Sequence, residues 1–274
     1  MHFLRLFWSA AKRWIESDAS RLAAALAYFT PFALVPLVVI SISIVGWFTD
    51  RAIFAALLQD WGAMLGLGAT EILADAVGEY DVEEAYFGVP ILAIIFLGAM
   101  IVFTVNNLAD GLRVVWGVHR RVGVRTVVSR VVRALSFFVL LQIFFITLFF
   151  IEVSLPDLVA VSVVPLQRLL LFIAIVALFT VGYKILSWKS PTVPACLAGG
   201  IVVALALLFM RTVVGWWLYF TPAVEQYGAA GLIFALLVWI YVTAMVIYYG
   251  AAYAWAFDHQ RLDGPARRQT VARP

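Results

Sequence analysis

The sequence contains little of what soluble domains and catalytic centres depend on. Only 13% of its 274 residues are charged, whereas ordinary domains carry about 25%. The single cysteine, Cys196, excludes a disulfide scaffold and a cysteine-rich zinc or redox site. The three histidines, His2, His119 and His259, are scattered, with no two at ligand spacing. We therefore expect no metal centre and no cofactor, and the 65% hydrophobic content predicts an integral membrane protein.

Long apolar stretches are what the sequence does contain. A membrane-spanning helix needs about 20 mainly apolar residues, and six stretches meet that length or come close to it. We expect an all-α integral membrane protein with six transmembrane helices in one polytopic domain covering residues 1–274. Residues 258–274 are expected to form a flexible cytoplasmic tail. The expected spans are about 22–48, 87–105, 134–151, 166–186, 195–214 and 228–257.

Charged residues divide unequally between the two sides that six spans create. The side with both termini carries 16 basic and 5 acidic residues, a net charge of +11. The other side carries 3 basic and 11 acidic residues, a net charge of −8. Basic loops stay cytoplasmic, so both termini are predicted to be inside. The basic residues flank membrane helices, where topology and anionic lipid head groups account for them, and no nucleic-acid partner is expected.

Two stretches outside the spans have helical periodicity. In residues 3–15 the aromatic and aliphatic side chains recur at helical spacing, and Arg5, Lys12 and Arg13 occupy positions between them. This pattern predicts an amphipathic helix lying at the inner membrane interface; a partner-binding helix is the alternative. The outer loop, 50–86, also shows helical spacing, with Glu71, Asp75 and Glu79 on one side. This acidic row either binds a cation or partner, or is a solvated face.

The first span contains two prolines, Pro31 and Pro36, close to Tyr28. Each proline removes a helical hydrogen bond and clashes with the carbonyl four residues earlier. Interrupted helices near mid-membrane form binding sites in many transporters. A permanent kink that lets a long helix fit the bilayer is the alternative interpretation.

The candidate substrate-contacting residues are polar, aromatic or proline residues in or near the spans. No acidic residue lies in the middle of a span, which weakens the case for proton-coupled transport. Gly250 and Ala254, four residues apart, predict a close packing seam. We find no nucleophile–base pair, and so expect no catalytic residues and no enzyme. The candidates for a cavity are Arg21, Tyr28, Pro31, Pro36, Asn106, Asn107, Arg113, Tyr183, Arg211, Tyr227 and Tyr241.

An ordered set of short segments resembles the YihY/BrkB family of bacterial inner-membrane proteins, formerly labelled ribonuclease BN. The resemblance covers residues 10 to 257. It implies a six-helix protein of the bacterial inner membrane, in a family linked to serum resistance, envelope lipid handling and transport. The segments are Asp18-Ala-Ser-Arg21 leading into Leu22 to Phe29, Pro36-Leu37, Asn106-Asn107 to Trp116, Pro194 to Gly200, and Tyr227-Gly228 through Leu237-Val-Trp239-Ile-Tyr241 to Gly250.

The residues and the resemblance together favour a transporter or an envelope-lipid-handling protein of undefined substrate. Its partners would be the bilayer and an anionic lipid or lipid-linked substrate. Arg21, Arg113 or Arg211 would contact the anionic head group of that lipid. The kinked first span and the tyrosine-rich sixth span are expected to line its cavity. The alternative is a non-transporting scaffold or assembly protein, docking through the outer loop or the N-terminal helix. A homo-oligomer is left open.

Overall fold

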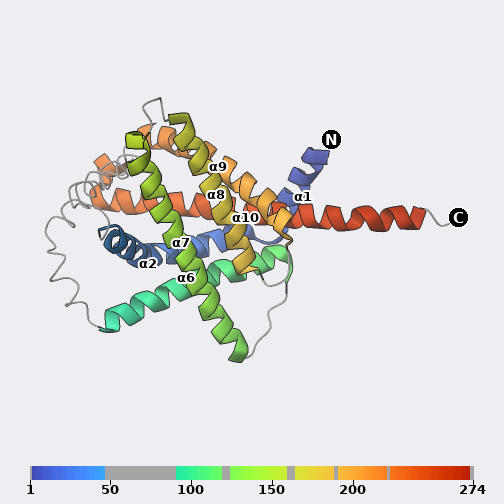
Figure 1. Ribbon diagram of the computed structural model, residues 1–274, viewed down its shortest axis with the longest axis horizontal. Helices are drawn as coiled ribbons and strands as arrows, with labels where there is room; N and C mark the ends of the chain where they lie inside the picture. Colours follow the sequence, from blue (N-terminus) through green and yellow to red (C-terminus); the bar gives the residue numbers. More distant parts are fainter. Residues whose placement is uncertain are drawn as a thin grey trace.

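The computed structural model describes residues 2–46, 91–118, 124–158, 164–187, 191–220 and 223–271. Within these ranges every regular element is an α-helix (Figure 1). The expectation of an all-α protein is confirmed for this part of the chain. The helices are α1 (His2–Glu16), α2 (Ala19–Gly46), α6 (Ile91–Trp116), α7 (Val124–Leu158), α8 (Val164–Leu186), α9 (Val193–Phe220) and α10 (Ala223–Val271).

Four of these helices have the length and composition of a membrane span. The apolar segments lie in α7, α8, α9 and α10, and that in α8 has the bounds expected from the sequence. Six crossings with both termini inside stay a prediction, because the first two expected spans, in α2 and α6, are only partly covered by described side chains. The helical outer loop expected at 50–86 lies outside the described residues. The four segments are Val128–Leu148, Leu166–Leu186, Val193–Met210 and Phe234–Gln260.

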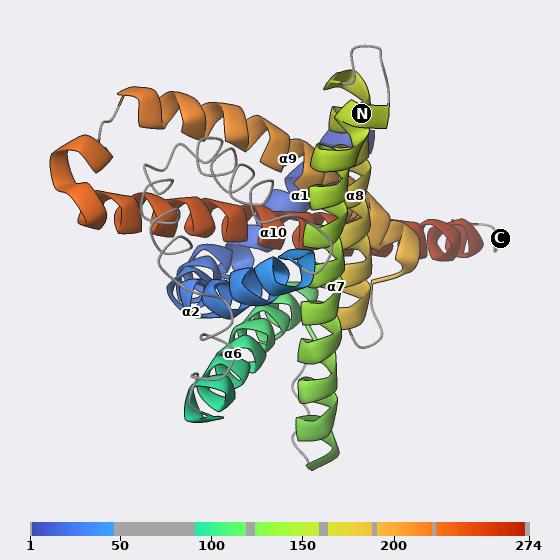
Figure 2. The ribbon, with the colours of Figure 1, turned by 60° about the vertical axis from the view of Figure 1, so that its left-hand side comes forward.

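Helix α10 runs through the middle of the fold, and α1, α2, α6 and α9 pack along it (Figures 1 and 2). It continues to Val271, into the segment expected to be a flexible tail, whose flexibility stays a prediction. Helix α8 packs against α9, and α7 packs against α8. Both views show α7 crossing α6 and α10 steeply. Steeply crossing helices pack closely only near the crossing point, which leaves room beside it.

Small residues bring α9 and α10 into backbone contact. A Cβ atom at Gly199 would lie 2.6 Å from the carbonyl oxygen of Gly250 and 3.1 Å from the Cβ of Ala254. No side chain fits between backbones at that distance. The expected packing seam at Gly250 and Ala254 is therefore present, and its partner is α9.

Helix α1 is docked onto the bundle by two of its side chains. Arg13 donates from Nε to the carbonyl oxygen of Val115 at 2.7 Å, at the C-terminal end of α6. Trp14 donates from Nε1 to the carbonyl oxygen of Met245 at 3.3 Å. In contrast, Trp8 on the same helix is 76% exposed. The predicted amphipathic helix is present, but one of its basic side chains binds protein, and its interfacial location stays a prediction.

Helix α2 changes direction part-way along its length (Figures 1 and 2). The helix contains two prolines, Pro31 and Pro36, and a proline has no backbone N–H to donate. One turn of α2 is tied to α6 here, because the Thr104 hydroxyl donates to the carbonyl oxygen of Phe29 at 3.2 Å. A neighbouring helix thus supplies a hydrogen bond beside Pro31, as is needed in an apolar surrounding.

Candidate functional site

An apolar cavity of about 250 Å³ lies where α2, α6, α7 and α8 meet. Its walls are formed by residues 26–33 of α2, 101–112 of α6 and 137–145 of α7, and by the last two turns of α8. Helix α10 contributes one residue, Ile247. Among the lining side chains are Leu26, Ala33, Leu108, Phe138, Leu141 and Phe179.

The hydroxyl groups in the cavity wall donate hydrogen bonds to backbone carbonyl oxygens. Three hydroxyl-bearing residues line the cavity. Each donates one hydrogen bond to a main-chain oxygen, so none presents its proton to the interior. A cavity lined in this way suits a hydrocarbon group rather than a polar solute. The three bonds are Thr30 to Leu26 at 2.7 Å, Thr104 to Phe29 at 3.2 Å and Tyr183 to Ile247 at 2.5 Å.

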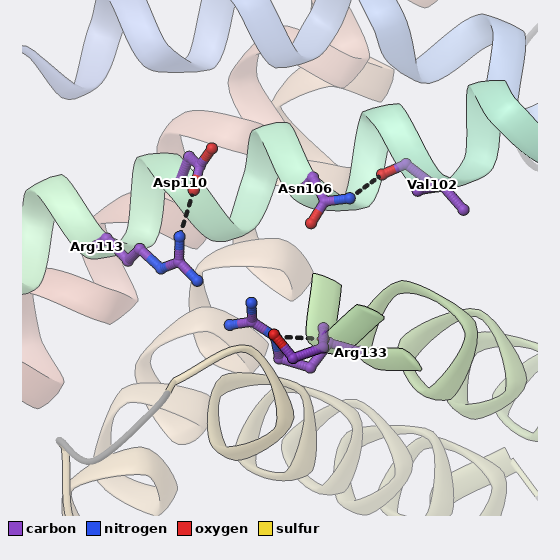
Figure 3. A network of polar contacts seen from close by, with 6 residues as sticks. Val102, Asn106, Asp110, Arg113 and Arg133 are labelled. Carbon is purple, nitrogen blue, oxygen red and sulfur yellow. Dashed lines mark hydrogen bonds and ion pairs between the residues drawn. The ribbon is translucent and has the colours of Figure 1, made fainter. Parts of the chain in front are cut away.

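A polar cluster lies between α6 and α7. Arg113 and Asp110 on α6 form an ion pair of 2.7 Å between Nη1 and Oδ1. The Arg133 side chain of α7 extends toward them (Figure 3), and its Nε donates to the carbonyl oxygen of Ser129 at 3.0 Å. The charges of Arg113, Arg130 and Asp110 all act on the Arg133 guanidinium.

This cluster adjoins one end of the cavity. Arg113 directly follows Leu112, and Arg133 precedes Phe137 by one helical turn. Both Leu112 and Phe137 line the cavity. The site therefore has an apolar compartment with a basic group of side chains beside it.

One predicted contact residue, Tyr183, lines the cavity. It is 2% exposed, and its ring also packs edge-on against Trp116, with centroids 5.9 Å apart. Arg113 belongs to the adjoining cluster. Asn106 lies on the same helix and donates from Nδ2 to the carbonyl oxygen of Val102 at 2.7 Å (Figure 3).

Other predicted residues lie away from the cavity. Tyr28 is 63% exposed and packs against Phe29. Arg21 forms a 3.7 Å ion pair with Asp18, and both side chains are exposed. The half-buried residues Pro31, Asn107 and Tyr241 are not among the lining residues. Among the described residues of α10, Ile247 lines this cavity, and the expected lining by tyrosines of the sixth span stays a prediction. The side chains of Pro36, Arg211 and Tyr227 lie outside the described residues.

The residues that sequence reasoning missed are the apolar wall of α7 and two of the arginines of that helix, Arg130 and Arg133. Phe137, Phe138 and Leu141 belong to a helix that is apolar on every side, so no periodicity singles out their face. Arg130 and Arg133 were explained by membrane topology alone. Their spacing of three residues, which places them on one helical face, was the available signal.

No group of three or more histidine, cysteine or acidic side chains that could hold a metal ion is found among the described residues. The one cysteine, Cys196, is free and fully buried. The described part of the site therefore consists of its apolar wall and its basic cluster.

The helices and their apolar surfaces define a polytopic α-helical membrane protein with an apolar cavity between its helices. The sequence profile of the family described as Virulence factor BrkB matches residues 10–273, and the chain belongs to this family. It is 25% identical over 250 residues to proteins named "UPF0761 membrane protein" from Coxiella burnetii, in strains Dugway 5J108-111 and RSA 493 / Nine Mile phase I. Each alignment covers 88% of both chains. No solved structure matches the chain.

Proposed function

We propose that this protein handles lipid in the bacterial inner membrane by binding a lipid hydrocarbon chain in the cavity between α2, α6, α7 and α8. Its role is binding or moving a lipid rather than covalent chemistry. Both termini are proposed to be cytoplasmic, in keeping with the charge asymmetry of the sequence.

The observation that carries the proposal is the apolar lining of a cavity of about 250 Å³. A space lined by leucine, isoleucine and phenylalanine accepts apolar guests. The volume approaches the lower end of ordinary ligand pockets, about 300 Å³. In a membrane the most abundant apolar guests of this size are segments of lipid chains.

A transporter of polar solutes receives less support. Its cavity would need donors or acceptors directed into the interior, whereas the hydroxyls of Thr30, Thr104 and Tyr183 all donate to backbone carbonyls. The scaffold alternative requires no cavity at all. A cavity-filling substitution therefore separates lipid handling from a scaffold role.

The test is native mass spectrometry of the protein released from lipid nanodiscs. Leu141→Trp places a larger side chain in the cavity wall, whereas Val139→Trp makes a similar change two residues away, where the side chain is 54% exposed. We expect the wild type and Val139→Trp to retain lipid in a defined stoichiometry, and Leu141→Trp to lose it. Equal retention by all three proteins would overturn the proposal.

A further inference from the structure

Three arginines and one aspartate lie on the facing helices α6 and α7, with Arg130 and Arg133 one helical turn apart on α7. The side chain of Arg113 is only 12% exposed and pairs with Asp110 at 2.7 Å. The Arg133 guanidinium interacts electrostatically with Arg113, Arg130 and Asp110. Figure 3 shows Arg113 and Arg133 extending toward each other from the two helices. The four side chains carry a net charge of +2 at neutral pH.

One buried side-chain donor of the cluster has no hydrogen-bond partner among the described residues. In the part of the chain that the structure describes, Nε of Arg130 is buried and has no hydrogen-bond partner. A buried donor without an acceptor is unfavourable, and three like charges at short range repel one another. An anion with several acceptor oxygens would relieve both.

The position of the cluster restricts the kind of anion. Arg113 and Arg133 lie next to Leu112 and one turn from Phe137, which line the cavity. A molecule with a chain in the cavity therefore has its polar end within reach of the arginines. The cluster lies on the side predicted to be cytoplasmic, where anionic lipids are abundant.

We propose that Asp110, Arg113, Arg130 and Arg133 form a binding site for the phosphate headgroup of an anionic lipid whose acyl chain enters the cavity. The proposal rests on the proposed function and specifies its lipid class. Guanidinium groups bind phosphate oxygens through paired N–H donors. Asp110 fixes the orientation of Arg113, which leaves the other N–H groups of that guanidinium for the ligand.

The experiment uses nanodiscs containing equal amounts of phosphatidylglycerol and phosphatidylethanolamine with identical acyl chains. Native mass spectrometry then gives the ratio of the two lipids retained by the full-length protein. We expect the wild type to prefer phosphatidylglycerol and Arg130→Gln to lower that preference about tenfold, as for the loss of a charge-assisted hydrogen bond. Lys12→Gln, which removes a basic residue that is 72% exposed, should leave the ratio unchanged.

Each outcome separates this proposal from the function on which it rests. Loss of both lipids in Leu141→Trp, with an unchanged ratio in Arg130→Gln, would overturn the headgroup site and leave the cavity function intact. Retention of both lipids in Leu141→Trp would overturn the cavity function, whatever the ratio in Arg130→Gln.

A soluble anion is the other source of a phosphate group. The same nanodiscs are therefore titrated with inorganic phosphate. Displacement of phosphatidylglycerol at low phosphate concentration would assign the site to a soluble anion and overturn the lipid assignment. Arg130→Lys keeps the charge without the planar fork and is expected to lower the preference less than Arg130→Gln does. If Arg130→Gln does not fold, the lipid preference of Arg130→Lys is measured in its place.

Discussion

The hydroxyl of Tyr183 on α8 donates a 2.5 Å hydrogen bond to the carbonyl oxygen of Ile247 on α10, and both residues line the cavity. This bond joins two helices that the sequence separates by 64 residues. It also removes the only hydroxyl of Tyr183 as a donor to a ligand. The contact therefore supports the wall of the cavity and keeps its interior apolar.

Tyr183→Phe removes this bond and keeps the ring. Hydrogen bonds between membrane helices contribute about 0.6 kcal/mol on average and at most about 1.7 kcal/mol. We expect a loss of stability in this range, measured by the unfolding midpoint of the purified protein in lipid–detergent mixtures. Tyr28→Phe, at a position 63% exposed, is the control and should change the midpoint much less. Equal effects of the two substitutions would contradict the structural role of the Tyr183 hydroxyl.

Gly199→Ala tests the seam between α9 and α10. The new Cβ would lie 2.6 Å from the backbone oxygen of Gly250, and a backbone atom cannot yield as a side chain can. Overpacking of this kind costs about 1–3 kcal/mol, so the unfolding midpoint should fall. Gly98→Ala on α6 is a matched control, because its Cβ would meet no atom within 4 Å. Alanine favours a helix by about 1 kcal/mol over glycine, so this control should be neutral or stabilising. A fall of the same size in both variants would contradict the seam.

Arg13→Gln tests the docking of α1. Arg13 binds the carbonyl oxygens of Val115 and Val114 and lies 4.8 Å from the ring centroid of Trp255. Hydrogen bonds to a charged group contribute about 1.5–3 kcal/mol, so hydrogen exchange in α1 should become at least about tenfold faster. The neighbouring Lys12 makes an exposed ion pair with Glu16 at 3.8 Å, and Lys12→Gln should have little effect. Unchanged exchange in Arg13→Gln would show that α1 is held by other contacts.

The orientation of the chain is tested with a membrane-impermeant thiol reagent. Cys196 is fully buried, so the wild type should not react. We expect Arg5→Cys to react only in inside-out vesicles and Arg168→Cys only from the opposite side, because the charge asymmetry places them on opposite faces. Labelling of both variants from the same side would contradict the predicted topology.

The existence of the helices was predictable, whereas the faces that they turn to one another were not. The apolar run of 166–186 coincides with a membrane-length segment because hydropathy is a local property of the chain. Tyr28 was expected to face a cavity and is instead exposed. In a helix that is apolar all round, such as α2, periodicity gives no sign of rotation about the axis.

The basic cluster could not be predicted from the sequence, for a different reason. Arg113, Arg130 and Arg133 come from two helices, and each is explained singly by the positive-inside rule. Only the packing of α6 against α7 brings them together at one end of the cavity. In contrast, Asp18 and Arg21 are only three residues apart in the sequence, and they form an exposed ion pair of 3.7 Å.

The most direct test of the cavity is photocrosslinking with a phospholipid that carries a diazirine near the middle of its acyl chain. Binding of a lipid chain predicts adducts on cavity residues such as Phe138, Leu141 and Phe179 that disappear in Leu141→Trp. Adducts confined to outward-facing residues such as Val139 and Ile143, and unchanged by that substitution, would contradict it.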